Sequence, residues 1–278
     1  MKKILITGAG SYIGTSVEAW LTQLEFNKEY AVDTIDVREN RWKNISFIGY
    51  DVLLHVAGIA HIKETRKNSS LYYQVNRDMA IEIAKKAKKE GLHQFIFLST
   101  MNVYGKITGV IKEDTIPKPI TSYGKSKLQA EQEICRLENS CFKVAILRPP
   151  MIYGKDCRGN YPKLSIVAKR FPIFPCVSSK RSMLYIDNLC EFVRTVIDSE
   201  KRGVFYPQNA EFVNVGEMVD LIAKSRGKKV YFIKGIDKII ICFGGVLAKK
   251  VLGTLLYDIG RDRCRTFTLE ESIRRTEV

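Results

Sequence analysis

The chain has 278 residues, of which 45% are hydrophobic and 27% are charged, an ordinary globular balance that can bury a core in one large domain or a large and a small one. The formal net charge of +15 predicts anionic partners: nucleotide phosphates, nucleic acid or an acidic membrane surface. The positive charge is spread along the chain, which excludes a nucleic-acid-binding tail.

Cysteine usage and apolar runs exclude several other classes. The 7 cysteines and 3 histidines form no metal-binding spacing, so no metal site is expected. The cysteines are odd in number and the N-terminal apolar run is too short for a secretion signal, so we expect reduced thiols and a cytoplasmic location. The most apolar uncharged run, 239–248, is too short to span a bilayer.

Strands alternate with helices over the first half of the chain. Apolar runs predict strands at 3–7, 30–35, 51–58, 95–98 and 142–147, and any strand near 42–45 must be abbreviated. Helical patterns follow Gly14 to about Glu25, cover 71–91, and continue from Tyr123 to about Leu137. This alternation predicts an α/β fold with a doubly wound parallel sheet.

The rhythm changes after Pro150. We expect a helix at 162–170, a strand at 181–186, a helix that Asp187 caps and that runs to Ile197, a helix at 217–226 and a strand at 229–233. The apolar segment 236–252 is interpreted as a packed helix, with a membrane-surface anchor as the alternative. The predicted domains are 1–150 and a smaller 151–278, from which 181–199 can return to the first.

A glycine-rich turn follows the first strand, with Gly8, Gly10 and Gly14 leading into a helix. Strand, glycine turn and helix form the context of a dinucleotide-phosphate site, because glycine lets the backbone approach a pyrophosphate at the helix N-terminus. Asp36 ends the second strand and suits a ribose 2′-hydroxyl, which predicts NAD. Arg38 could instead meet the 2′-phosphate of NADP.

Tyr123 and Lys127 stand four residues apart, so they share one face of their predicted helix. An ammonium beside a phenol favours the phenolate, lowers the phenol's pKa from about 10 and allows proton exchange nearer neutral pH. The same spacing also fits an exposed helix face, so it counts only together with other motifs. His55, inside the third strand, is interpreted as a core histidine.

Seven segments between Thr7 and Asn188 carry further motifs. In chain order they are Thr7–Gly14, His55–Gly58, Asn76, Ser99–Gly105, Tyr123–Lys127, Leu147–Gly154 and Arg181–Asn188. Their order and sequences, such as Y-G-K-S-K in the fifth, resemble the extended short-chain dehydrogenase/reductase family, in its nucleotide-sugar epimerase/dehydratase branch. The chain departs from the family pattern at Ser11, which replaces a glycine, and at Met151 and Asn188, which replace an Asn and an Asp.

The resemblance implies a Rossmann-type sheet, a smaller C-terminal substrate-binding α/β subdomain, an NAD cofactor, a nucleotide-sugar substrate and a homodimer formed through the helix at 71–91 and the Tyr123 helix. It implies that Tyr123 is the acid/base at the sugar oxygen, that Thr100 hydrogen-bonds that oxygen, and that Lys127 lowers the phenol's pKa and binds the nicotinamide ribose. The implied NAD contacts are Gly8, Gly10, Ser11, Tyr12, Ile13, Gly14, Asp36, Val56, Ala57, Gly58, Asn76, Ser99, Tyr123, Lys127 and Pro150. The implied substrate contacts are Thr100, Met101, Asn102, Met151, Asn160 and Arg181, of which Arg181 grips the diphosphate.

Three functions fit these residues. The favoured one is an NAD-dependent C4 epimerase of a UDP-hexose or UDP-N-acetylhexosamine for surface polysaccharide synthesis. The alternatives are an NAD(P)H-dependent reductase of a nucleotide-4-keto-6-deoxy sugar, which Arg38 and the chain end at 251–258 and 270–276 favour by resemblance, and a non-catalytic NAD(P)-binding sensor or scaffold. A 4,6-dehydratase is excluded, since such enzymes carry Asp-Glu where this chain has Met101 and Asn102.

Overall fold

The computed structural model describes the whole chain except residues 27, 61, 63, 236–244 and 246–251. It forms two compact units, each made of separate stretches of sequence. The first unit contains Met1–Gly105, Pro117–Pro149 and Leu189–Pro207, and the second contains Lys106–Ile116, Pro150–Asn188 and Gln208–Val278. Residues 106–116 therefore belong to the second unit, although the sequence places them in 1–150. The apolar segment predicted at 236–252 lies almost wholly outside the described residues.

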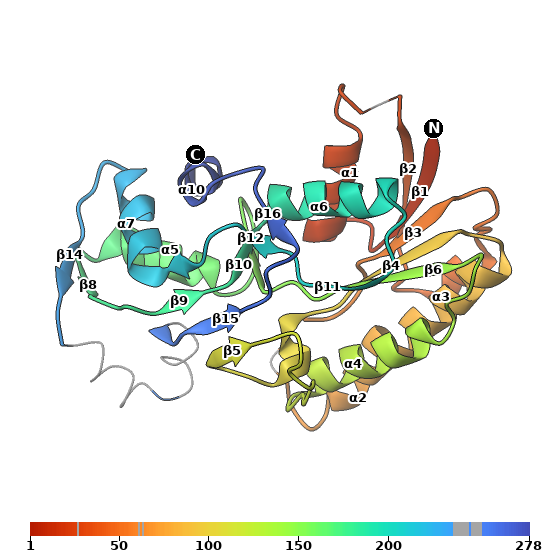
Figure 1. Cartoon of the computed structure of the whole chain (residues 1–278), viewed down its shortest axis with the longest axis horizontal. Coiled ribbons are helices and arrows are strands. Elements are labelled where there is room, and N and C mark those ends of the chain that lie inside the picture. Colours follow the sequence, from red (N-terminus) through yellow and green to blue (C-terminus); the bar gives the residue numbers. More distant parts are fainter. Residues whose placement is uncertain (27, 61, 63, 236–244, 246–251) are drawn as a thin grey trace. The chain divides into compact units, whose positions relative to one another are not determined.

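A six-stranded parallel sheet forms the centre of the first unit, in the order β11-β6-β4-β3-β1-β2 (Figure 1). The strands are β1 (Lys2–Thr7), β2 (Tyr30–Ile35), β3 (Val52–His55), β4 (Gln94–Leu98), β6 (Lys143–Leu147) and β11 (Gly203–Phe205). Its central strands β3 and β4 are buried at every residue, as expected when helices cover both faces of a parallel sheet. The predicted doubly wound α/β fold is confirmed.

Helices cover both faces of this sheet (Figure 1). One face carries α1 (Tyr12–Leu21) and α6 (Ile186–Asp198), and the other carries α2 (Ser69–Tyr73), α3 (Ala80–Lys89) and α4 (Ser122–Cys135). Alternate strand residues such as Leu5, Leu53 and Phe95 form one core cluster with alanines and isoleucines of α3 and α4. This packing fixes α4 against the sheet.

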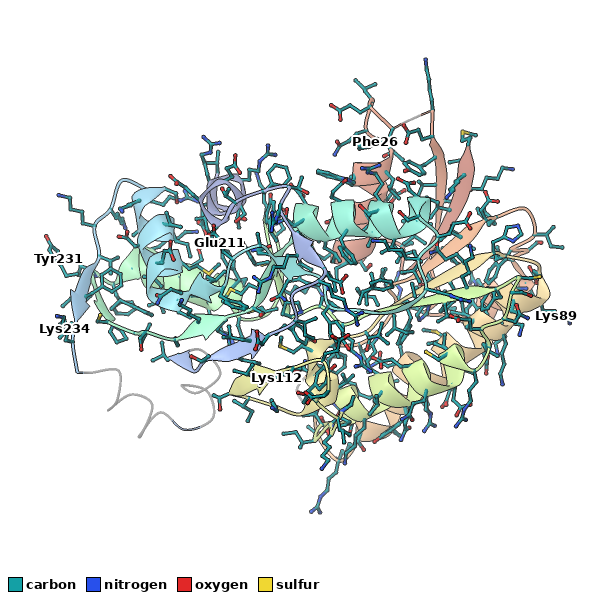
Figure 2. All side chains as sticks on the ribbon, viewed as in Figure 1. Phe26, Lys89, Lys112, Glu211, Tyr231 and Lys234 are labelled. Carbon is teal, nitrogen blue, oxygen red and sulfur yellow. The ribbon has the colours of Figure 1, made fainter. Side chains whose placement is uncertain are left out.

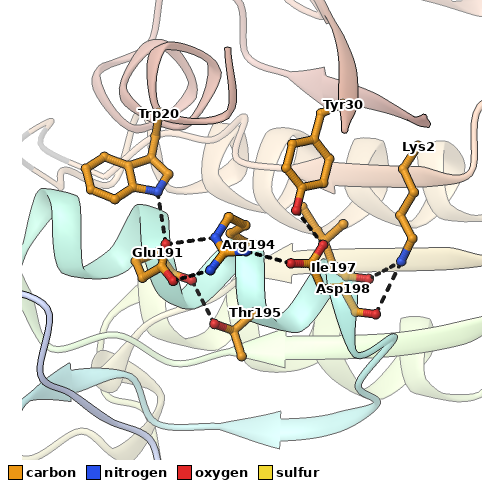
Figure 3. Close-up of polar contacts among 8 residues, drawn as sticks. All are labelled: Lys2, Trp20, Tyr30, Glu191, Arg194, Thr195, Ile197 and Asp198. Atoms are coloured by element: carbon orange, nitrogen blue, oxygen red, sulfur yellow. Dashed lines mark hydrogen bonds and ion pairs between the residues drawn. The ribbon is translucent and has the colours of Figure 1, made fainter. Parts of the chain in front are cut away.

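Helix α6 is tied to the edge of the sheet by polar contacts (Figure 3). The Trp20 indole donates to Glu191 at 3.2 Å, and Lys2 Nζ donates to the Ile197 carbonyl at 2.8 Å. Arg194 pairs with Glu191 and with Asp198. These contacts explain why a segment that follows the second unit's strands in sequence returns to the first.

Four of the elements differ from those predicted. Residues 40–44 form a 3-10 helix, η1 (Asn40–Asn44), instead of a short strand, because only Trp42 among them is buried. The single helix predicted at 71–91 is interrupted by a π-helical segment, η2 (Gln74–Met79), between α2 and α3. Helix α1 ends at Leu21, before Glu25. Asp187 lies inside the first turn of α6 and accepts from Tyr185 Oη at 2.9 Å, so it is not the residue that precedes the helix.

Among the described residues, the second unit contains short strands and the helices α5, α7 and α10. Its elements are β5 (Gly109–Ile111), β7 (Met151–Tyr153), α5 (Tyr161–Arg170), β8 (Ile173–Pro175), β9 (Lys180–Arg181), β10 (Met183–Tyr185), β12 (Gln208–Asn209), β13 (Val213–Asn214), α7 (Val215–Lys224), β14 (Tyr231–Ile233), β15 (Leu255–Tyr257), β16 (Arg263–Cys264) and α10 (Leu269–Glu277). The strand predicted at 181–186 is split at Ser182, whose hydroxyl accepts from Tyr257 N at 2.8 Å. None of the described helices is long and apolar enough to cross a membrane.

Candidate active site

The glycine turn sits between β1 and the N-terminus of α1. Gly8 and Gly10 have left-handed φ angles of 96° and 71°. A Cβ on Gly14 would stand 2.8 Å from Ser11 Oγ and 2.9 Å from the Gly8 carbonyl, so only glycine fits there. Ser11, which replaces the family's glycine, is the N-cap of α1 and accepts from Gly14 N at 3.2 Å. The turn therefore keeps the close backbone approach that a pyrophosphate site needs.

Asp36 and Arg38 form an exposed ion pair at the end of β2. Arg38 Nε donates to both carboxylate oxygens of Asp36, at 3.0 and 2.8 Å. Hydrogen bonds from Arg38 lower the pKa of Asp36 to about 2. An ionised carboxylate accepts from a ribose hydroxyl and repels a 2′-phosphate, so this corner suits NAD better than NADP.

Helix α4 approaches the loop after β4 so closely that the two backbones touch. Thr100 is the N-cap of the 3-10 helix η3 (Met101–Tyr104) and accepts from Asn102 N at 3.1 Å. A Cβ on Gly124 would stand 2.7 Å from the Asn102 carbonyl oxygen. The glycine after Tyr123 therefore permits the approach that lets the Tyr123 and Thr100 side chains share a hydrogen bond.

The pKa of Tyr123 is raised, because the phenol is buried, and its hydrogen bond with Thr100 opposes the rise. Lys127 is not among the causes of this shift, so the predicted lowering of the phenol's pKa by Lys127 stays a prediction. The Lys127 ammonium donates to the Leu98 carbonyl at 2.9 Å and lies 4.5 Å from the centre of the Phe97 ring. Burial lowers the pKa of Lys127 to about 8. In this structure Tyr123 is therefore a protonated phenol and Lys127 a titratable cation.

Asn76 ties the loop after β3 to the catalytic helix. Its side chain accepts from Ile59 N at 2.9 Å, donates to the Ile59 carbonyl at 3.0 Å, and reaches Ser126 Oγ at 3.5 Å. A Cβ on Gly58 would stand 2.8 Å from Asn76 Oδ1 and 3.3 Å from Lys127 Nζ. The expected cofactor-side residues Gly58, Asn76 and Lys127 thus meet around one point. Asn76 itself holds protein backbone.

His55 lies beneath this group and is fully buried. Its Nδ1 is 2.8 Å from Thr7 Oγ1, and the rings of Phe95 and Phe97 stack on it. Burial, with the charge of Lys127 as a second cause, lowers the pKa of His55 to about 3. The ring is neutral at physiological pH, which agrees with its interpretation as a core histidine.

Arg148 and Glu131 form a buried ion pair next to the candidate site. The sequence analysis did not predict this pair. Arg148 donates to Glu131 through Nε and Nη2, at 3.1 and 2.6 Å to Oε2, and its Nη1 donates to Tyr104 Oη at 2.8 Å. Ser99, expected at the cofactor, directs its hydroxyl to Glu131. Glu131 lies four residues beyond Lys127, so the spacing of Tyr123 and Lys127 continued once more would have found it.

The remaining expected contacts divide between the two units. In the first, Met101 and Ala57 are buried, whereas Asn102 and Gly58 are exposed. The second unit contains Pro150, which is buried, and Met151, Asn160 and Arg181. Asn160 precedes α5 without a side-chain cap bond. Arg181 Nη1 donates to the Gly253 carbonyl at 2.6 Å, and burial lowers its pKa. Partly buried Tyr12, Ile13 and Val56 complete the expected set.

Changing Gly124 to Ala is expected to lower turnover by about 100-fold, because a methyl group 2.7 Å from the Asn102 carbonyl forces Tyr123 and Thr100 apart. Steady-state rates of the purified variant would measure the change. Lys125→Ala is the matched control, since Lys125 is the exposed next residue of the same helix turn. Equal activity of the two variants would show that the close approach does not position the phenol.

Turnover is expected to fall as pH rises through about 8, where Lys127 loses its proton. The folded-state pKa of Lys127 is depressed from its ordinary 10.5 to about 8. Burying the charged ammonium therefore lowers the stability of the folded protein below pH 8. This destabilisation disappears gradually as the pH rises from 8 to 10.5, because the folded protein then holds Lys127 uncharged. The pH–rate profile tests this directly. A flat profile from pH 7 to 9.5 would contradict a catalytic role for the Lys127 charge.

The parallel sheet, the glycine turn after β1 and the Thr100, Tyr123 and Lys127 side chains are the features of a Rossmann-type enzyme that binds a dinucleotide at the carboxyl ends of its strands. Residues 4–216 match the NAD dependent epimerase/dehydratase family. The chain belongs to this family, and its cofactor is therefore a nicotinamide dinucleotide.

Individual relatives agree with this assignment. The chain is 28% identical over 294 residues to a UDP-glucose 4-epimerase of Vibrio cholerae, covering 94% of this chain and 89% of that protein. The structure resembles UDP-glucuronic acid 4-epimerase from Bacillus cereus in complex with NAD, at 20% identity and a TM-score of 0.73, covering 99% of this chain and 97% of the other. It also resembles a dTDP-4-dehydrorhamnose reductase from Clostridium acetobutylicum, at 21% identity and a TM-score of 0.75, covering 99% and 98%. At these identities the two structural likenesses show the fold.

Proposed function

We propose that the protein is an NAD-dependent C4 epimerase of a nucleotide sugar, a UDP-hexose or UDP-N-acetylhexosamine used for surface polysaccharide. The observation that carries the proposal is the close approach of the Tyr123 helix to the segment of Thr100, whose side chain acts on the pKa of the phenol, with the Lys127 ammonium held at the end of β4. The relation to a UDP-glucose 4-epimerase over nearly the whole chain supports it.

In this proposal Tyr123 moves a proton to and from the oxygen on C4. Thr100 donates a hydrogen bond to the same oxygen and stabilises negative charge there. Bound NAD supplies the hydride acceptor and a further positive charge beside the phenol. Lys127 keeps its charge below pH 8 and binds the nicotinamide ribose. Because Tyr123 can return the proton to the C4 oxygen in either orientation of the keto sugar, while hydride would return to either face of C4, one set of residues serves both directions.

The cofactor contacts remain those that the sequence predicts, with two changes of role. Asn76 and Ser99 act through the protein: Asn76 holds the Ile59 backbone and Ser99 holds Glu131. For the substrate, Met151, Asn160 and Arg181 stay the ligands that the sequence predicts. Arg181 keeps donors beyond the one that bonds Gly253, and a guanidinium pairs bidentately with a diphosphate.

Reduction of a nucleotide-4-keto sugar is the second candidate. The Thr100, Tyr123 and Lys127 side chains could also catalyse this reduction. The structural likeness to a dTDP-4-dehydrorhamnose reductase supports it as the second candidate. The Asp36–Arg38 pair weighs against the NADP-dependent form, because Asp36 stays ionised where the 2′-phosphate would lie. A reductase needs exchangeable NAD(P)H for each turnover, whereas the epimerase needs only cofactor that stays bound.

Proton NMR of purified protein with UDP-N-acetylglucosamine or UDP-glucose, without added cofactor, separates the two reactions. The epimerase is expected to produce the anomeric signal of the C4 epimer. Absence of any epimer, together with stoichiometric oxidation of NAD(P)H by a nucleotide-4-keto-6-deoxy sugar, would establish the reductase instead.

The homodimer implied by the resemblance stays a prediction, for which light scattering should give twice the 31.7 kDa chain mass.

A further inference from the structure

An exposed apolar surface lies at the edge of the second unit, where β8 and β14 pair. Six large apolar side chains there are between 38% and 65% exposed: Ile166, Phe171, Ile173, Tyr231, Phe232 and Ile233. The two strands bring part of this set together, since Tyr231 is in register with Ile173 and its backbone N–H donates to the Pro172 carbonyl at 2.7 Å. We call these six residues the β8–β14 patch. An apolar cluster of this kind on a folded unit usually marks a contact surface.

Every residue of β14 is exposed, although a strand that covers a core hides alternate side chains. The Phe232 ring packs edge-on against the buried Phe174 ring, with the ring centroids 6.3 Å apart. Figure 2 shows Tyr231 and Lys234 projecting from β14 away from the rest of the second unit. Tyr231 and Ile233 therefore present their side chains on the outer face of the strand, whereas Phe232 faces Phe174 and Gly216 and remains only partly exposed.

Basic side chains border the patch. Residues 169–175 and 228–234 contain Lys169, Arg170, Lys228, Lys229 and Lys234 and no Asp or Glu. Lys169 pairs with Glu277 at 2.8 Å, which leaves the four other cations, all exposed. Lys228 Nζ donates to the Lys169 carbonyl at 2.7 Å, so this lysine lies beside the end of α5. Arg170 stands four residues after Ile166, on the same side of that helix.

This combination identifies the occupant by its chemistry. Aromatic and aliphatic side chains enter the boundary between lipid head groups and acyl chains, while lysine and arginine beside them meet anionic head groups. A second copy of the chain would bring an identical set of cations against the first, which is unfavourable. An uncharged apolar partner would leave the four cations without a counterpart.

We propose that the β8–β14 patch docks the protein on the surface of an anionic phospholipid bilayer. The apolar side chains insert at the interface, and Arg170, Lys228, Lys229 and Lys234 bind lipid phosphates. The proposal goes beyond the C4 chemistry above and does not depend on it.

Flotation of the purified full chain with phosphatidylcholine vesicles containing none, about 15% or about 30% phosphatidylglycerol tests the proposal. The bound fraction is expected to rise with phosphatidylglycerol. The double variant Lys229→Gln/Lys234→Gln is expected to bind about 10- to 30-fold more weakly, because each surface lysine contributes several-fold to such binding. Ile173→Ser/Tyr231→Ser is expected to bind about tenfold more weakly at unchanged net charge.

The matched control is Lys85→Gln/Lys89→Gln on α3, which removes the same charge from exposed positions elsewhere (Lys89 is labelled in Figure 2). It should bind within about twofold of the unmodified chain, and far-ultraviolet circular dichroism should show all variants folded. Equal weakening by both lysine pairs would overturn the proposal, since charge alone would then explain the binding. So would absence of binding to 30% phosphatidylglycerol, or a self-association that only the patch variants abolish.

Discussion

Replacing Tyr123 with Phe is expected to lower turnover by about 10²- to 10⁴-fold, the usual contribution of a positioned acid/base group. The variant loses the hydroxyl that bonds Thr100 and keeps the aromatic ring, which packs edge-on against Tyr72 with centroids 6.3 Å apart. Because only one atom is removed from a partly buried ring, the fold and the cofactor turn should be unchanged. The loss should appear in kcat, with little change in nucleotide-sugar affinity.

Steady-state kinetics beside thermal unfolding measures both halves of this prediction. Tyr73→Phe is a suitable control, because Tyr73 lies on α2, and the cation–π contact of its ring with Arg77 survives the change. The control should keep nearly full activity. If Tyr123→Phe keeps comparable activity, the phenol is not the acid/base, and an unaffected cellular role would favour the sensor or scaffold alternative.

Replacing Glu131 with Gln is expected to lower the free energy of unfolding by about 3–5 kcal/mol. The Glu131 and Arg148 side chains are only 4% and 10% exposed, so the variant would leave a guanidinium buried without its counter-charge. The pair also joins α4 to the end of β6 and, through Tyr104 and Ser99, to the segment that carries Thr100. Turnover should therefore fall as well, even where the variant is fully folded.

Urea denaturation measures the loss, and the same helix offers a matched control. Glu133 pairs with Arg136 at the surface, where the two side chains are 47% and 73% exposed, so Glu133→Gln should cost less than about 1 kcal/mol. The double variant Glu131→Gln/Arg148→Met should regain part of the stability, because no buried charge remains unpaired. A Glu131 variant no less stable than the Glu133 variant would show that the buried pair contributes little.

Most of the first unit's fold could be predicted, because its strands are short, almost wholly apolar segments that fit a buried parallel sheet better than a helix or a loop. Buried parallel strands read as short apolar runs, and all five predicted strands are present within a few residues of their predicted bounds. β11 was not predicted, because Gly203–Phe205 is a three-residue edge strand with no repeating pattern. The π-helical segment η2 was not predicted either. It contains Asn76, whose side chain bonds the Ile59 backbone 17 residues away, and no local sequence pattern shows that contact.

The residues proposed for the site come from the sequence and stay a prediction, whereas their electrostatic surroundings could be described only from the structure. Spacing brought Tyr123 and Lys127 to one helix face, yet it did not show that the ammonium bonds the Leu98 carbonyl. The direction of the phenol's pKa depends on burial, which only the fold decides. Likewise, the sequence places Arg148 in the Leu147–Gly154 motif, but it does not show the ion pair with Glu131, which forms only when β6 and α4 pack together.

The most direct test of the proposed function follows a deuterium atom on C4 of the nucleotide sugar. Purified protein in ordinary water, without added cofactor, should convert the C4-deuterated substrate to an epimer that keeps its deuterium, because the hydride leaves C4 and returns while Tyr123 moves only the oxygen-bound proton. The Tyr123→Phe variant should form this product far more slowly. An epimer that has lost its deuterium would contradict transient oxidation at C4.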